Sequence, residues 1–168
     1  MESRLKILGH PVHPMLVMFP VALLVTTVLF DIIDALGGPN YLGQLAFWNL
    51  SVGLIGGLLA AAAGLVDLLA IPRGTRAKRV GQTHAAANTA MLLLFAAVWV
   101  VRLNAEYRTA GGALIAIEVV AVAILGVAAW LGGELVDRLG VGVERDANLN
   151  APSSLRPTGS GQQMGGAR

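Results

Sequence analysis

Three histidines carry most of the chemistry that this sequence offers, and each stands near the start of a predicted helix. His10 and His13 lie in the segment His-Pro-Val-His-Pro, and His84 opens the third predicted helix with Asn88 four residues further along. Residues four apart share a face of a helix, so the Asn88 amide is expected beside the His84 ring. Imidazole binds metals, haem iron included, and exchanges protons near neutral pH.

The spacing of His10 and His13 predicts that the two rings cannot both bind one small metal ion. A residue before proline favours extended or polyproline geometry, which puts the rings on one face about 9 Å apart. The two histidines can bracket a larger group, or one of them alone can be a ligand. In the structural alternative, His13 helps to cap its helix and His10 lies among lipid headgroups. Both interpretations stay open on these residues alone.

Two carboxylates, Asp67 and Glu134, lie near the ends of the second and fourth predicted helices, at the membrane level of the histidines. Ionisable groups inside a membrane are costly, so each one is a functional candidate. For Asp67 we favour a salt bridge with Arg73 or Arg76. His84 can be a haem or metal ligand, or it can pair with one of the two carboxylates.

The helices that must position these groups are predicted from four long apolar stretches. A membrane-spanning helix needs about 20 mostly apolar residues, and such stretches cover residues 14–36, 45–71, 83–103 and 113–135. Thr83 is expected to cap the third helix. The predicted fold class is all-α, an integral membrane four-helix bundle. It divides into a short N-terminal segment (1–13), the transmembrane domain (14–143) and a disordered tail (144–168) that is too polar to form a core.

The distribution of positive charge predicts the orientation of these spans. Of the 12 Lys and Arg residues, all but Arg102 and Arg108 fall on one side. The positive-inside rule makes that side cytoplasmic and places both termini there, together with the histidines, Asp67 and Glu134. The groups expected on the opposite side are Asp31, Asp34, Asn49 and Glu118.

The spans also form two similar hairpins, each with a histidine at its start and a carboxylate near its end. Small residues four apart, Gly53 and Gly57 in the second span and Ala128 and Gly132 in the fourth, predict close packing within the molecule. The chain has no cysteine, which excludes disulfides, thiolate metal sites and thiol catalysis. The basic residues flank apolar spans, so they indicate topology and not nucleic-acid binding.

Two motifs resemble those of a known family. The segment 9–20, GHPVHPMLVMFP, is similar to the opening motif of the bacterial membrane family DUF2231, and the segments WLGGELV (130–136) and GVGV (140–143) resemble its closing motif. The resemblance covers residues 10–143 and implies a four-helix, multi-pass protein of the bacterial cytoplasmic (inner) membrane. Some relatives are joined to Rieske-type domains, and the helix layout is similar to that of small b-type cytochromes. Relatives often carry histidine where Met18 and Leu139 stand here.

The residues and the resemblance together lead to one main hypothesis, a redox-linked membrane protein with one haem b at the cytoplasmic side. Its axial ligands would be His84 and either His13 or His10, and Asn88, Asp67 and Glu134 would orient the imidazoles. A redox protein would be its partner besides the lipid bilayer. The alternative is a non-catalytic membrane anchor or partner-binding subunit with structural histidines. A proton or ion path through the carboxylates is the weakest hypothesis, and the residues assign no enzyme activity.

Overall fold

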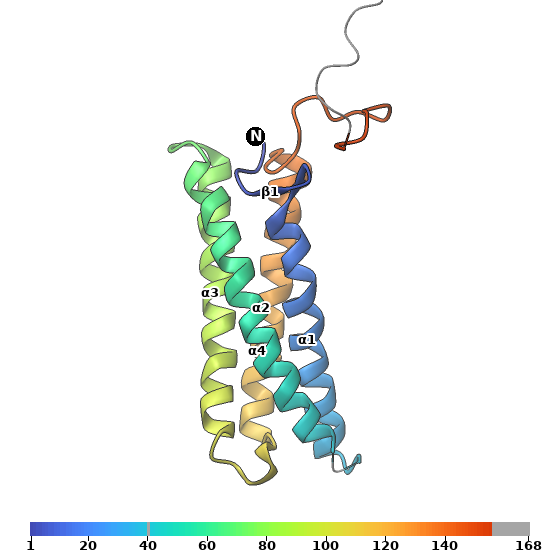
Figure 1. The fold of residues 1–168 in the computed structure, drawn as a ribbon. Coiled ribbons are helices and arrows are strands. Elements are labelled where there is room, and N and C mark those ends of the chain that lie inside the picture. Colours follow the sequence, from blue (N-terminus) through green and yellow to red (C-terminus); the bar gives the residue numbers. More distant parts are fainter. Residues whose placement is uncertain (40, 156–168) are drawn as a thin grey trace, which may run out of the picture.

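The computed structural model describes residues 1–39 and 41–155 and shows four long helices packed side by side (Figure 1). The helices are α1 (Val12–Ala35), α2 (Leu42–Ala70), α3 (Arg76–Arg102) and α4 (Gly112–Gly133). A 3₁₀ turn, η1 (Glu106–Arg108), precedes α4, and a π-helical turn, η2 (Glu134–Arg138), follows it directly. Each of the four is long and apolar enough to cross a membrane. The predicted all-α fold is confirmed.

The outer surface of the bundle is apolar, as a lipid-facing surface must be. Large side chains such as Leu58, Leu69 and Trp130 are about two-thirds exposed or more. Apolar exposure on this scale is unusual for a soluble protein and marks contact with a membrane or a partner. The backbone groups are meanwhile paired within helices, which is what a lipid environment requires of a spanning segment.

The third helix begins seven residues earlier than its apolar stretch predicted. Thr75 is its N-cap, with its side-chain oxygen accepting from the Lys78 amide at 3.1 Å. The prediction that Thr83 caps this helix is therefore wrong, and the Thr83 hydroxyl instead donates to the Arg79 carbonyl at 3.1 Å within the helix. Lys and Arg are good helix formers, so the basic segment extends the helix beyond its hydrophobic part.

The N-terminal segment folds over one end of the bundle as a small hairpin. Strands β1 (Lys6–Ile7) and β2 (His10–Pro11) pair antiparallel, with Ile7 opposite His10. The turn between them uses Leu8 and Gly9, both at positive φ, which is the backbone that a two-residue hairpin turn needs. The predicted polyproline geometry of the His-Pro-Val-His-Pro segment is wrong, because strand and helix divide this segment between them.

The hairpin and the residues that follow α4 lie at the same end of the bundle, which we call the terminal end (Figure 1). The amide of Gly142 donates to the Met1 carbonyl at 2.7 Å, and the Lys6 ammonium contacts Glu144 at 2.6 Å. Residues 144–155 are exposed and form turns. The rest of the predicted disordered tail, 156–168, lies outside the described residues. The other end, with the connections after α1 and after α3, is called the loop end.

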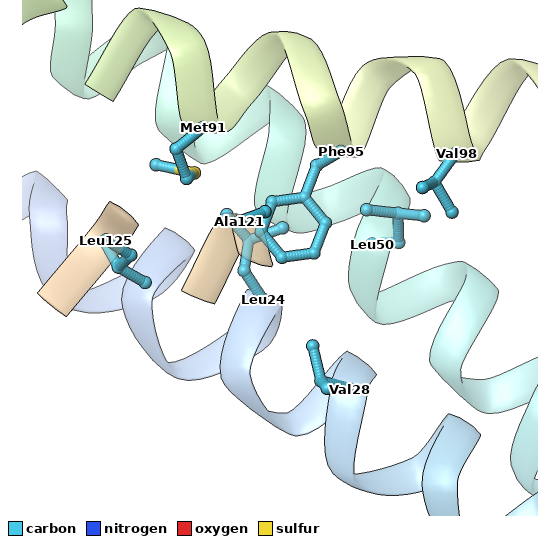
Figure 2. Close-up of a cluster of buried hydrophobic side chains, with 8 residues drawn as sticks. All are labelled: Leu24, Val28, Leu50, Met91, Phe95, Val98, Ala121 and Leu125. Atoms are coloured by element: carbon cyan, nitrogen blue, oxygen red, sulfur yellow. The ribbon is translucent and has the colours of Figure 1, made fainter. Parts of the chain in front are cut away.

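The middle of the bundle is an apolar core to which all four helices contribute, and Figure 2 shows its buried side chains. Its buried members are Leu24, Val28, Leu50, Met91, Phe95, Val98, Ala121 and Leu125. Helix α1 packs mainly on α2, and α3 mainly on α4, so the bundle consists of two hairpins. A Cβ on Gly53 would lie 2.9 Å from Leu24, and one on Gly57 would lie 2.6 Å from Leu92. The small residues thus serve packing within the molecule, as predicted.

Candidate functional site

His13 and His84 meet between the two hairpins at the terminal end. His13 lies in the first turn of α1, and His84 lies in the third turn of α3; both side chains are half-buried. Their ring centroids are 6.3 Å apart, and the ring planes meet at 84°. The histidines that the sequence singled out on separate helices are therefore brought together by the fold.

Each imidazole of this histidine pair is oriented by a backbone carbonyl of its own hairpin. Nδ1 of His13 lies 2.8 Å from the carbonyl oxygen of Ala60, and Nδ1 of His84 lies 2.8 Å from that of Ala128. A carbonyl oxygen only accepts, so Nδ1 must carry the proton and donate in both rings. In a neutral imidazole this tautomer leaves Nε2 with a free lone pair, the arrangement that metal-binding histidines use.

A glycine one turn beyond each carbonyl makes room for the ring. A Cβ on Gly64 would lie 2.9 Å from the His13 ring, and one on Gly132 would lie 3.3 Å from the His84 ring. The two hairpins thus repeat one device, a histidine seated on an Ala-x-x-x-Gly segment of the following helix. The sequence showed the histidines and the small residues, but their contact depends on how each helix is turned about its axis.

Asn88 lies directly beside His84, as its spacing predicted. Its amide nitrogen is 3.2 Å from Nε2 of His84 and donates to the His84 carbonyl oxygen at 2.9 Å. Because Nε2 of His84 is the unprotonated nitrogen, it accepts from the amide. Both nitrogens of His84 are therefore engaged, whereas no hydrogen bond reaches Nε2 of His13 within residues 1–39 and 41–155.

His10 is separated from this pair. It lies in β2 with an exposed side chain, and its Nδ1 is 3.2 Å from the Leu8 carbonyl oxygen of the same hairpin. The strand turns His10 outward while His13 enters the helix, so the two rings no longer share a face. The option of His10 as partner of His84 loses its geometric basis.

The two carboxylates assigned to the histidines have other partners. Asp67 accepts from the Ser3 hydroxyl at 2.7 Å and from the Arg4 amide at 2.7 Å, so it fastens the N-terminal segment to α2. Glu134 forms an ion pair with Arg76 at 2.6 Å. The predicted salt bridge of Asp67 with Arg73 or Arg76, and the pairing of His84 with either carboxylate, are wrong. Ser3 can donate its hydroxyl to Asp67 because the N-terminal segment folds back over the helix ends.

A second polar cluster, which the sequence interpretation missed, is buried at the loop end. Arg102 is 0% exposed and donates to Asp31 through both terminal guanidinium nitrogens, Nη1 at 2.6 Å and Nη2 at 3.0 Å. The same Nη1 lies 3.3 Å from Glu118, which is also 0% exposed. Paired, parallel contacts of this kind are the strongest geometry for an arginine and a carboxylate. The sequence interpretation counted Arg102 only as a charge on the side opposite the histidines, whereas it is the last residue of α3 and its side chain is buried.

The connection after α3 completes the surroundings of Arg102. The Arg108 carbonyl oxygen accepts from Nε at 2.8 Å, and the Gly43 carbonyl oxygen accepts from Nη2 at 2.9 Å. Tyr107 and Arg108 both have positive φ, which is uncommon for residues with side chains. Strained backbone of this kind persists where the surroundings demand it. Here it delivers a carbonyl to a buried cation.

One signal in the sequence could have found the loop-end cluster. Asp31 stands eighteen residues after His13, and Arg102 stands eighteen residues after His84. Eighteen residues make five turns of a helix, so each pair lies on one face of its helix. Since the histidines mark the inward face, Asp31 and Arg102 had to point inward too.

The fold and these clusters define a class, a multi-pass membrane protein with polar groups buried between helices at both ends of a four-helix bundle. The chain belongs to the DUF2231 family, described as a predicted membrane protein, whose family model matches residues 9–145. This confirms the family to which the resemblance pointed. No curated protein and no solved structure matches the chain.

Proposed function

We propose that this chain is a redox-linked membrane protein that binds one haem b through His13 and His84. The observation that carries the proposal is the paired geometry, two imidazoles from separate hairpins that each donate Nδ1–H to a carbonyl 2.8 Å away. The ring centroids of His13 and His84 lie 6.3 Å apart, so both imidazoles would be near enough to hold one haem iron.

The number of donors favours haem over a bare metal ion. Within the described residues, no group of three or more His, Cys, Asp or Glu side chains is placed to hold a metal. A structural or catalytic zinc ion takes at least three protein ligands, whereas haem iron needs only its axial ones. Haem would supply one-electron transfer. The chain's own part would be to hold the rings through Ala60 and Ala128, and to release the Asn88 amide from His84 Nε2.

The orientation and the partner belong to the same proposal. The charge distribution favours a cytoplasmic terminal end, so the histidine pair would lie at the cytoplasmic side of a bacterial inner membrane, with a redox protein as its partner. Arg102 is buried and paired with carboxylates, so of the two basic residues expected at the loop end only Arg108 remains as a loop charge. The difference in basic residues between the two ends is therefore larger than the sequence suggested. Reporter fusions after Gly38 and after Lys78 should report outside and inside respectively, and the reverse result would contradict this orientation.

The visible spectrum of protein purified from haem-replete cells tests the haem proposal. We expect a Soret band and split visible bands on reduction. His84→Ala and His13→Ala should each abolish them, since each removes an axial ligand. His10→Ala is the matched control, because His10 is exposed and outside the pair, and it should leave the spectrum intact. Asn88→Ala should shift the potential without abolishing the bands.

The other outcomes separate the two candidate functions. Colourless protein would refute the haem proposal. Bands that survive His84→Ala would keep haem and reject this ligand. The alternative, an anchor or partner-binding subunit with structural histidines, is favoured by the Asn88 amide on His84 Nε2, which satisfies that ring without any metal. This alternative predicts no chromophore. It also predicts that the melting temperature falls in His13→Ala and in His84→Ala but not in His10→Ala.

A further inference from the structure

The loop-end cluster holds more negative charge than its arginine can neutralise. All five N–H bonds of the Arg102 guanidinium are used, by Asp31 twice, by Glu118 once, and by the carbonyls of Gly43 and Arg108. Arginine stays protonated in proteins, so it contributes one positive charge. Two ionised carboxylates beside it would leave one uncompensated negative charge in a membrane-spanning bundle.

The excess falls on Glu118. Asp31 takes two short contacts from the guanidinium, whereas Glu118 makes one longer contact, at 3.3 Å. The second carboxyl oxygen of Glu118, Oε2, is buried and has no hydrogen-bond partner among the described residues. A buried carboxylate oxygen without a partner is costly in any protein and more so in lipid.

Among the described residues, no neighbouring element supplies the missing positive charge. Helix α4 brings Glu118, α3 brings Arg102, and α1 brings Asp31 and, one turn nearer the loop end, Asp34, which is a further acid. The η1 connection brings Arg108, but its guanidinium lies over the Phe47 ring at 4.8 Å. Within residues 1–39 and 41–155, Arg102 alone forms ion pairs with these carboxylates.

We propose that Glu118 is a proton-binding site, held as the neutral acid inside the bundle by the Arg102–Asp31 pair. Protonation converts the Glu118 carboxylate to a carboxylic acid and leaves one cation facing one anion. Asp31 accepts from the same Nη1 as Glu118, so its carboxylate is the acceptor available to the new O–H. Asp34, half-buried and three residues beyond Asp31 on α1, provides a carboxylate between this cluster and the loop-end solution for proton exchange. This inference does not depend on haem.

Infrared spectroscopy of the full chain in lipid nanodiscs tests the proposal. At neutral pH the protein should show the C=O stretch of a protonated carboxylic acid, and the band should shift in D2O. Labelling with ¹³C-glutamate should move it, and labelling with ¹³C-aspartate should not, which assigns the residue without any substitution. Glu118→Gln should remove the band. Glu134→Gln, which alters an ion-paired glutamate at the terminal end, should keep it.

Three results would overturn this assignment. A band that follows the aspartate label, or that survives Glu118→Gln and disappears in Asp31→Asn, places the proton on Asp31. Absence of the band in the wild-type protein means that the site is ionised. If, in addition, the melting temperature rises when sodium replaces choline in the buffer, and does not rise in Glu118→Gln, then a monovalent cation and not a proton occupies the site.

Discussion

The two ends of the bundle use equivalent positions of the two hairpins in opposite ways. At the terminal end α1 and α3 carry the same residue, histidine, and eighteen residues later they carry Asp31 and Arg102. The identical pair is half-buried and depends on backbone carbonyls and on glycines. The oppositely charged pair is excluded from solvent and binds side chain to side chain. The comparison shows how one repeated scaffold supports both a pair of histidine rings and an ion pair.

Helices α2 and α4 extend this comparison. Ala60 and Gly64 in α2 correspond to Ala128 and Gly132 in α4, and with the same offset Leu50 corresponds to Glu118. Both Leu50 and Glu118 are 0% exposed. The first hairpin thus fills with an apolar side chain the place where the second introduces a carboxyl group. The excess negative charge at the loop end is a departure of one hairpin from the repeat.

Removal of the arginine should break the loop end with the largest effect. Arg102→Leu leaves Asp31 and Glu118 buried without their cation, and breaking a buried pair in this way costs about 3–5 kcal/mol. Unfolding in detergent, followed by circular dichroism, measures the loss. Arg76→Leu is the control at the terminal end, since its ion pair with Glu134 is exposed at the arginine side and should contribute about 1 kcal/mol or less. Equal stabilities for the two variants would contradict the comparison.

Alanine at Gly64 and at Gly132, the glycines that make room for the two rings, should show which histidine is packed more tightly. Gly64→Ala places a Cβ 2.9 Å from the His13 ring, whereas Gly132→Ala places one 3.3 Å from the His84 ring. Overpacking costs about 1–3 kcal/mol, and we expect Gly64→Ala to be the more destabilising change. Gly126→Ala is the control, because nothing lies within 4 Å of its Cβ. It should be neutral or slightly stabilising. The reverse order for Gly64 and Gly132 would show that His84 is the more tightly held ring.

The smallest effect concerns the pH range over which the N-terminal hairpin stays docked. Hydrogen bonds to Glu144 and Glu2 raise the pKa of Lys6 above its ordinary value of 10.5, and the hydrogen bond from Lys6 lowers the pKa of Glu2 below its ordinary value of 4.5. The contribution of Glu2 to the docking of the hairpin is therefore lost as the pH falls through its lowered pKa. The contribution of Lys6 to docking is lost as the pH rises through its raised pKa.

Between these limits docking should not change with pH. The protection factors of the β1 and β2 amides in hydrogen exchange measure docking. Lys6→Met should lower these protection factors across the whole range and leave them with little dependence on pH. Lys78→Met is the matched control, since Lys78 contacts the Leu68 carbonyl and not the hairpin. Unchanged exchange in Lys6→Met would show that Ser3 and Asp67 hold the segment without the ammonium.

Local rules of the sequence determined the helices and the contacts within them. Composition alone predicted four spans, because a bilayer requires long apolar segments whatever their partners are. The helical period placed Asn88 beside His84. The prediction was wrong where two local signals disagree about where a helix begins. Apolar content placed the start of α3 at Thr83, whereas helix propensity and the N-cap place it just after Thr75.

Only the tertiary structure decided which groups meet across the bundle. His13 contacts His84, Arg102 forms an ion pair with Asp31, and Asp67 accepts from Ser3. The two partners of each contact are far apart in the sequence. Such pairings depend on the rotation of each helix about its axis and on how closely two helices approach, which the glycines of α2 and α4 set. A charge next to an apolar run looks the same in sequence whether it faces water or the core. Arg102 faces the core because five acceptors surround it there: three carboxylate oxygens, the Gly43 carbonyl of α2 and the Arg108 carbonyl of the strained α3–α4 connection.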